Sequence, residues 1–200
     1  MLTKLDAVNY LLDVLGSSPV DSIDNLHPDV ASCVNKLERS QHLITQKGYW
    51  FNRDKGRTFT PTAAGDIVVP HTVMKIVDAP IGVIQRGVQL YNTIDNTYKF
   101  NGPITCDAIT DLEWDYLPVS VRNAIMYHAG VQVASIDLED SQKAAEQNEQ
   151  FASAIAMVNA EQTEMTRHNF LTSPSALRTR SRLQPYRRAQ FNPNYPGGGY

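Results

Sequence analysis

The chain has 200 residues, enough for one globular domain or two small ones with a sizeable core. Apolar residues make up 42% and charged residues 20%, as in ordinary soluble folds, and no apolar run reaches the roughly 20 residues of a membrane helix, so we expect no membrane partner. The two cysteines, Cys33 and Cys106, lie far apart, which excludes a disulfide-rich or zinc-knuckle domain and favours production in a cytoplasm.

Charge is sorted along the chain, although the total is only −3. Residues 1–100 carry ten acids and ten bases, residues 101–166 carry eleven acids and two bases, and residues 167–200 carry six arginines and no acid. Such sorting favours contacts between subunits or with a partner, and it specifies no fold.

The N-terminal segment predicts a pair of helices. Apolar residues recur at helical spacing before Gly16, with Thr3 and Asp6 placed as a capping box and the glycine as the terminator. After a loop, Pro28 begins a second helix that is expected to end near Lys47.

The pattern changes at Gly48 to short β-favouring runs separated by Gly, Pro and Asn-Asp pairs. The strand candidates are RTFTP, DIVVP, VMKIVD, GVIQRG, QLYN, TYKFN and ITCDAIT. The stretch QLYNTIDNTYKFNG predicts a hairpin with Leu90 and Tyr91 on one strand and Tyr98 and Phe100 on the other. Strands of this length and spacing predict a small antiparallel sheet or sandwich.

Helix returns at Pro118, after which apolar residues occupy every fourth position. Residues 139–167 are rich in Ala, Glu and Gln, which are good helix formers. The expected fold class is α+β: a four-helix bundle formed by N- and C-terminal helix pairs, an inserted small antiparallel β domain and an extended C-terminal arm. The expected domains are 1–48 and 117–172 for the helical bundle, 49–116 for the β domain and 173–200 for the Arg-rich arm.

The segment after Thr172 holds four prolines, three consecutive glycines and five arginines, and cannot bury enough apolar area to fold by itself. Its aromatic residues suit pockets on a partner, so we interpret it as a docking arm. The candidate docking residues are Arg178, Arg180, Arg182, Tyr186, Arg187, Arg188 and Phe191. The same arginines suit phosphate neutralisation, so a nucleic-acid-binding module stays open as an alternative.

Candidate catalytic groups do not converge in the sequence. The histidines are scattered, His128 is expected to be a packed or surface residue, and Cys33 a buried small hydrophobe. Asp111, Glu113 and Asp115 alternate, but the glycine and distal glutamate of a calcium loop are missing, so we interpret them as a solvated acidic turn. We expect no enzyme, no cofactor and no metal. A hydrolase of cell-envelope glycans is the weaker alternative.

Four stretches together carry a family resemblance: LDAVNYLLDVLGSSPV (5–20), LITQKGYWFN (43–52), GVQLYNTIDNTYKFNGPIT (87–105) and LPVSVRNAIMYHAG (117–130). In order and spacing they resemble the tail tubular protein A family, the tail adaptors, or head-to-tail connectors, of short-tailed, podovirus-type phages. The resemblance covers most of residues 5–170. It implies a virion protein, assembled in the host cytoplasm as a twelve-subunit ring between the portal vertex and the tail nozzle protein, and forming part of the channel for DNA ejection.

The predicted partners are therefore further copies of the chain, the portal protein, the nozzle protein and genomic DNA that passes without sequence-specific binding. Contacts that close a ring are heterologous, so one face must complement a different one. An acidic wall would repel passing phosphates, and its candidate residues, for the channel or for an inter-subunit face, are Glu146, Glu149, Glu161 and Glu164. The candidate β-domain interface residues are Tyr91, Tyr98 and Phe100.

Overall fold

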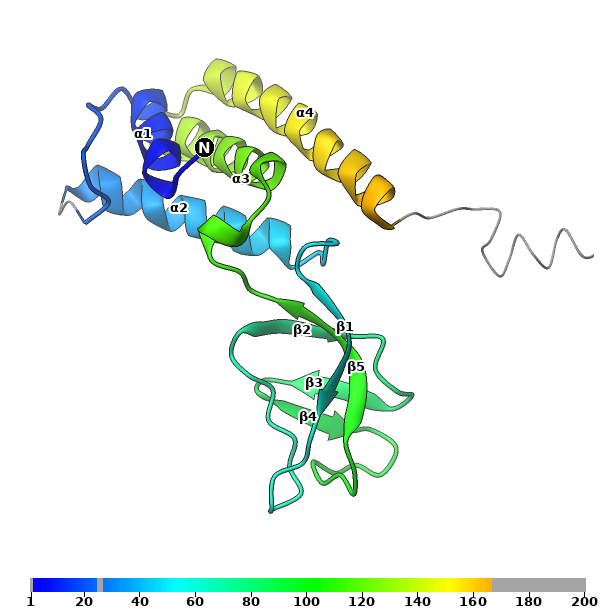
Figure 1. Ribbon diagram of the computed structural model, residues 1–200. Coiled ribbons are helices and arrows are strands. Elements are labelled where there is room, and N and C mark those ends of the chain that lie inside the picture. The colour runs from blue at the N-terminus through cyan, green and yellow to red at the C-terminus, as the bar shows by residue number, and fades with distance from the viewer. Residues whose placement is uncertain (1, 25–26, 167–200) are drawn as a thin grey trace, which may run out of the picture. The chain divides into compact units, whose positions relative to one another are not determined.

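The computed structural model describes residues 2–24 and 27–166 (Figure 1). The described elements are the helices α1 (Lys4–Leu15), α2 (Pro28–Thr45), α3 (Val119–Gln132) and α4 (Ser141–Thr166), the strands β1 (Arg53–Phe59), β2 (Val73–Val77), β3 (Val83–Arg86), β4 (Gln89–Asn92) and β5 (Ile104–Thr110), the 3₁₀ turn η1 (Trp114–Tyr116) and the π-helical turn η2 (Val133–Asp137). The predicted α+β class, with four helices and small antiparallel sheets, is confirmed. Contacts divide the chain into two units, Met1–Gln162 and Thr163–Tyr200.

Helix α1 begins and ends as the sequence predicts. The Thr3 hydroxyl accepts from the Asp6 backbone N–H at 3.1 Å, and the Thr3 N–H donates to the Asp6 carboxylate at 2.8 Å, which completes the capping box. This backbone hydrogen bond holds the pKa of Asp6 below its usual value. Gly16 ends the helix in the left-handed conformation, with φ of 82°.

Helix α2 begins at Pro28, as expected, but ends at Thr45, before the predicted limit at Lys47. The reason lies at Gly48, whose φ is 78° and where a Cβ would lie 2.5 Å from the Ile109 side chain. Only glycine allows the chain to turn this closely over β5 and enter β1.

One apolar core holds side chains from all four helices. The predicted stripe at every fourth position is fully buried: Val121, Ile125, Ala129 and Val133. Helix α4 adds the buried Val158 and the half-buried Phe151 and Ile155. Helical spacing predicts that Met165 shares this apolar face, but Met165 is exposed, so that prediction is wrong. The arrangement as a four-helix bundle and the domain boundaries stay predictions.

The strands form two antiparallel sheets, with orders β1-β5-β2 and β3-β4, around a second apolar core. The predicted strands at 66–70 and 97–101 make only isolated bridges. The predicted hairpin is therefore partly wrong: β4 pairs along its length with β3, and only Asn92 pairs with Thr97. The physical reason is the connection through Gly87, with φ of 58°, because a two-residue turn with positive φ matches the twist of the strands.

Candidate interaction surfaces

Asn52 connects the helical part to the three-stranded sheet. Its side-chain amide donates to the backbone oxygens of Thr45, at 2.9 Å, and Thr110, at 3.2 Å, and its oxygen accepts from the Tyr49 N–H at 2.9 Å. The residue is buried, and its three bonds join backbone groups at the end of α2, in the following turn and at the end of β5. The amide therefore determines how the chain passes from helix to strand.

Arg122 is a buried arginine that no carboxylate neutralises among the described residues. Its Nε donates to the Leu117 oxygen at 2.8 Å, and its two terminal nitrogens donate to the oxygens of Leu2, at 2.9 Å, and Asp115, at 2.6 Å. The side chain thus ties the N-terminus and the connector before α3 together. Sequence reasoning missed it, although it is one of only two bases in residues 101–166.

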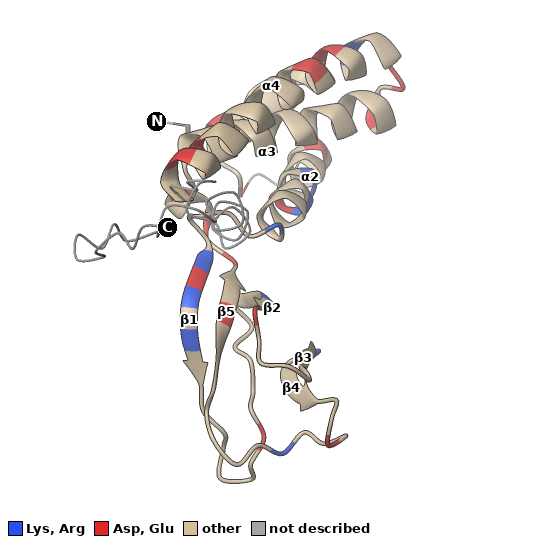
Figure 2. Ribbon diagram, turned by 90° about the vertical axis from the view of Figure 1, so that its right-hand side faces the viewer, with Lys and Arg blue, Asp and Glu red and all other residues tan. Residues whose placement is uncertain are grey.

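The four acidic candidates all lie in α4, where Figure 2 shows separate acidic patches. Glu146, Glu149 and Glu164 are exposed, as a surface role requires. Glu161 differs because it is half-buried and accepts from the Ser120 hydroxyl at 2.6 Å. It braces α3 against α4, which gives it a structural contact within the chain.

The three aromatic candidates of the β part lie in different environments. Phe100 is buried in the second core. Tyr91 is also buried, with the Arg86 guanidinium 3.6 Å from its ring centroid and the Tyr98 ring 4.7 Å away. Only Tyr98 is exposed. The structure therefore brings Tyr91 and Tyr98 together and leaves Phe100 in the interior.

Sequence reasoning missed three exposed isoleucines in and around β3 and β4. Ile81 is 94% exposed and Ile94 is 66% exposed, and Ile84 is directly opposite Tyr91 in the β3–β4 pair. Ile94 packs over Gly82, the residue next to Ile81, where a Cβ would meet its side chain at 2.6 Å. We call Ile81, Ile84, Ile94 and Tyr98 the outer β3–β4 face. Exposed apolar groups gathered in this way are typical of a protein contact site.

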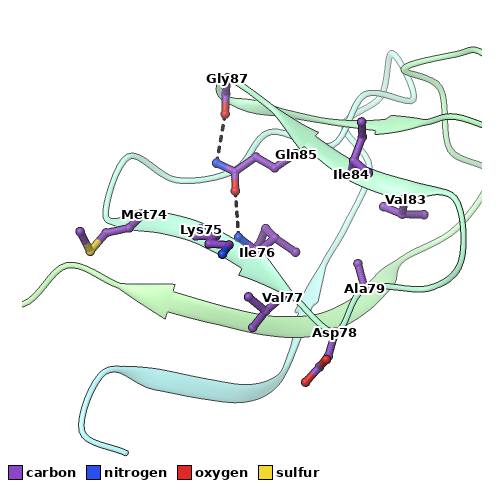
Figure 3. A pocket seen from close by; sticks show the side chains of 10 residues that line it. All are labelled: Met74, Lys75, Ile76, Val77, Asp78, Ala79, Val83, Ile84, Gln85 and Gly87. Atoms are coloured by element: carbon purple, nitrogen blue, oxygen red, sulfur yellow. Dashed lines mark hydrogen bonds between the residues drawn. The ribbon is translucent and has the colours of Figure 1, made fainter. Parts of the chain in front are cut away.

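A cavity of about 650 Å³ separates β2 from β3 (Figure 3). Gln85 extends from β3 across it, where its oxygen accepts from the Ile76 N–H at 2.9 Å and its nitrogen donates to the Gly87 oxygen at 3.1 Å. Among the described residues of its lining, only Lys75 and Asp78 are charged. The cavity holds no pair of groups that would act as acid and base.

The candidate nucleophile and base are packed as expected. Cys33 is fully buried, and burial raises the pKa of its thiol to about 11, so the reactive thiolate is not available. The Nδ1 atom of His128 lies 2.9 Å from the Ser40 hydroxyl, and its ring contacts Phe151.

Within residues 2–24 and 27–166, no cluster of His, Cys, Asp or Glu has the geometry to hold a metal ion. None of the helices described has the length and apolar character to cross a bilayer.

Burial lowers the pKa of His128, which makes stability depend on pH. The unfolded chain takes up a proton as the pH falls through about 6.5, while the folded chain resists it, so this contribution is complete above that pH and is lost below it. We expect a lower urea midpoint at pH 5.5 than at pH 7.5. His128→Gln should flatten this change, whereas His71→Gln, at an exposed site, should not. An equal pH dependence in His128→Gln would contradict the prediction.

All seven docking-arm candidates, from Arg178 to Phe191, lie outside the described residues.

The described residues therefore present unlike acidic and apolar surfaces, and Cys33 and His128 are packed inside. The family model of tail tubular proteins matches residues 5–180. Over 143 residues the chain is 32% identical to tail tubular protein A of Klebsiella phage KP34. The matched residues make up 70% of this chain and 74% of that protein. The chain belongs to the tail tubular protein family, as its resemblance predicted. It is a structural protein of the phage tail, from a family that is not one of enzymes.

Proposed function

We propose that this chain is the subunit of a tail adaptor ring that joins the portal vertex to the tail nozzle and forms part of the DNA ejection channel. The observation that carries the proposal is the outer β3–β4 face, where Ile81 and Ile94 expose apolar surface. An adaptor needs such a face for a partner, and its assembly in the host cytoplasm needs no active site. Family membership supports the same role.

The acidic residues of α4 supply the second surface of this proposal. Glu146 and Glu149 are exposed one helical turn apart, and Glu164 is exposed near the end of the same helix. Carboxylates on a channel wall repel phosphates, so DNA passes without being held. Glu161 is a weaker candidate for this wall because its carboxylate already accepts from Ser120.

Ring closure requires two different surfaces on each subunit, since head-to-tail contacts are heterologous. The chain offers surfaces that differ in charge and polarity: the acidic α4 surface, the apolar outer β3–β4 face and the basic stretch 173–200. The arm would supply arginine pairs and aromatic anchors to the portal protein or to a neighbouring copy. The β part, with Tyr98 and the isoleucines, would contact the nozzle protein.

Native mass spectrometry of the chain, by itself and then mixed with portal and nozzle proteins, tests the proposal. We expect a discrete species with twelve copies of the chain in the mixture. The double variant Ile81→Ser/Ile94→Ser should weaken nozzle binding more than tenfold, because it removes the apolar contact. Ile136→Ser, at an exposed site on η2, is the matched control and should bind normally.

A stable monomer that binds neither partner would overturn the adaptor function. DNA binding that weakens steeply with added salt, in the absence of any ring, would instead favour the nucleic-acid-binding alternative.

A further inference from the structure

A groove of about 770 Å³ lies where α2, the segment before β2 and the connector from β5 to α3 meet. Its walls carry four carboxylates, from Glu38, Asp111, Glu113 and Asp115, and one lysine, Lys4. The lysine is already paired with Glu38 at 2.9 Å. The other three carboxylates are exposed and make no ion pair with the described residues, so the groove has a strong negative excess.

The connector that carries these carboxylates is held in place by its backbone. The Asp111 N–H donates to the Thr72 oxygen at 2.7 Å, and the Gln41 side chain donates to the Leu112 oxygen at 2.8 Å. Trp114, also in the lining, is buried. A preformed acidic groove suits an arginine-rich peptide, since guanidinium groups pair with carboxylates.

The chain itself contains a segment with the complementary charge. Residues 167–200 hold six arginines and no acid, and the run RTRSR places Arg178, Arg180 and Arg182 at alternate positions. In an extended chain, alternate side chains point to one side about 6.6–6.8 Å apart. Asp111 and Glu113, in the connector after β5, and Asp115, in η1, supply an equal number of charges of the opposite sign. The eleven residues between Thr166 and Arg178 can span about 40 Å when extended.

We propose that this groove receives the arginine-rich run 178–182 of a second copy of the chain, and that this contact links adjacent subunits. The inference rests on the proposed ring, and it identifies the surface that takes the basic arm. The sequence suggested that the acidic connector was only a solvated turn. The proposed contact makes it a docking site for a segment of the same protein.

Crosslinking between two full-length variants tests the contact. One copy carries Glu113→Cys, the other carries Arg180→Cys and a tag that changes its mass, and both are mixed with portal and nozzle proteins and a short bifunctional maleimide. The native Cys33 and Cys106 are buried and should react slowly. We expect the mixed dimer at least tenfold above its level for Glu149→Cys with Arg180→Cys, which tests the acidic α4 surface as a rival receiver. Raised salt should reduce the yield because the pairs are exposed.

The neutral variant Asp111→Asn/Glu113→Gln/Asp115→Asn keeps side-chain size and removes three charges. We expect it to populate the ring at least fivefold less than Asp13→Asn/Asp21→Asn/Glu139→Gln, which removes three charges at exposed sites outside the proposed surfaces. A ring that forms without the Glu113–Arg180 crosslink would overturn this inference and leave the adaptor function standing. A Glu113–Arg180 crosslink without any ring would support the contact between copies but would overturn the adaptor function. A variant that carries both cysteines in one copy tests whether the contact forms within that copy. A product from this variant alone, or a stronger product at Glu149, would also overturn the inference.

Discussion

Replacing Arg122 by alanine is expected to lower the free energy of unfolding by about 4 kcal/mol. Three backbone oxygens, of Leu117, Leu2 and Asp115, lose their charged donor, and the residue is 2% exposed, so water replaces it poorly. Urea unfolding monitored by circular dichroism measures the change.

Arg122→Lys should recover only part of the loss, because one ammonium cannot reach three oxygens in the geometry of a guanidinium. Arg39→Ala, at an exposed site on α2, is the matched control and should change stability by less than about 0.5 kcal/mol. If Arg122→Ala unfolded within that same range, the three hydrogen bonds would not have the role assigned to them.

Asn52→Ala should lower the free energy of unfolding by about 3 kcal/mol, because it breaks the three hydrogen bonds that connect α2, the following turn and β5. Asn52→Asp should be at least as harmful. It keeps an acceptor for the Tyr49 N–H but turns a carboxylate oxygen toward the oxygens of Thr45 and Thr110, where an amide donated before. Urea unfolding measures both, and hydrogen exchange should show faster exchange in β5.

The control for Asn52 is Asn35→Ala, an exposed site on α2. Alanine is the better helix former, so this change should be neutral or stabilising by a few tenths of a kcal/mol. Equal effects at the two asparagines would contradict a specific role for the buried amide.

Local patterns predicted the helices well because their signals lie within a few residues. The capping box of Thr3 and Asp6, the terminating Gly16 and the first-turn Pro28 all depend on neighbours in the sequence. The apolar stripe of α3 is likewise a local periodicity, and the structure buries it completely. The strands were predicted less well, since pairing partners compete over longer distances. The turn at Gly87 joined β4 to β3 and left Tyr98 outside any ladder.

The candidate surface residues also divide into those that local sequence predicts and those that depend on tertiary packing. That Glu146 and Glu149 are exposed follows from a helix rich in polar residues, but the contact of Glu161 with Ser120 depends on how α4 packs on α3. The exposure of Ile81 and Ile94 depends on how the loops beside β3 and β4 lie, since neither side chain joins the second core. No property of an isoleucine in the sequence distinguishes these two from the buried Ile67.

By itself, the sequence determined the α+β class, both ends of α1, the start of α2, the charge sorting and the family, because composition, periodicity and motif spacing are properties of the chain. Only the tertiary structure decided the roles of Arg122 and Asn52, the outer β3–β4 face and the acidic groove. Each of these depends on groups far apart in the chain, such as Arg122 and Leu2 or Glu38 and Asp111, which come together only when the apolar cores form. Burial then gives a polar side chain its partners, and exposure leaves an apolar one free for another protein.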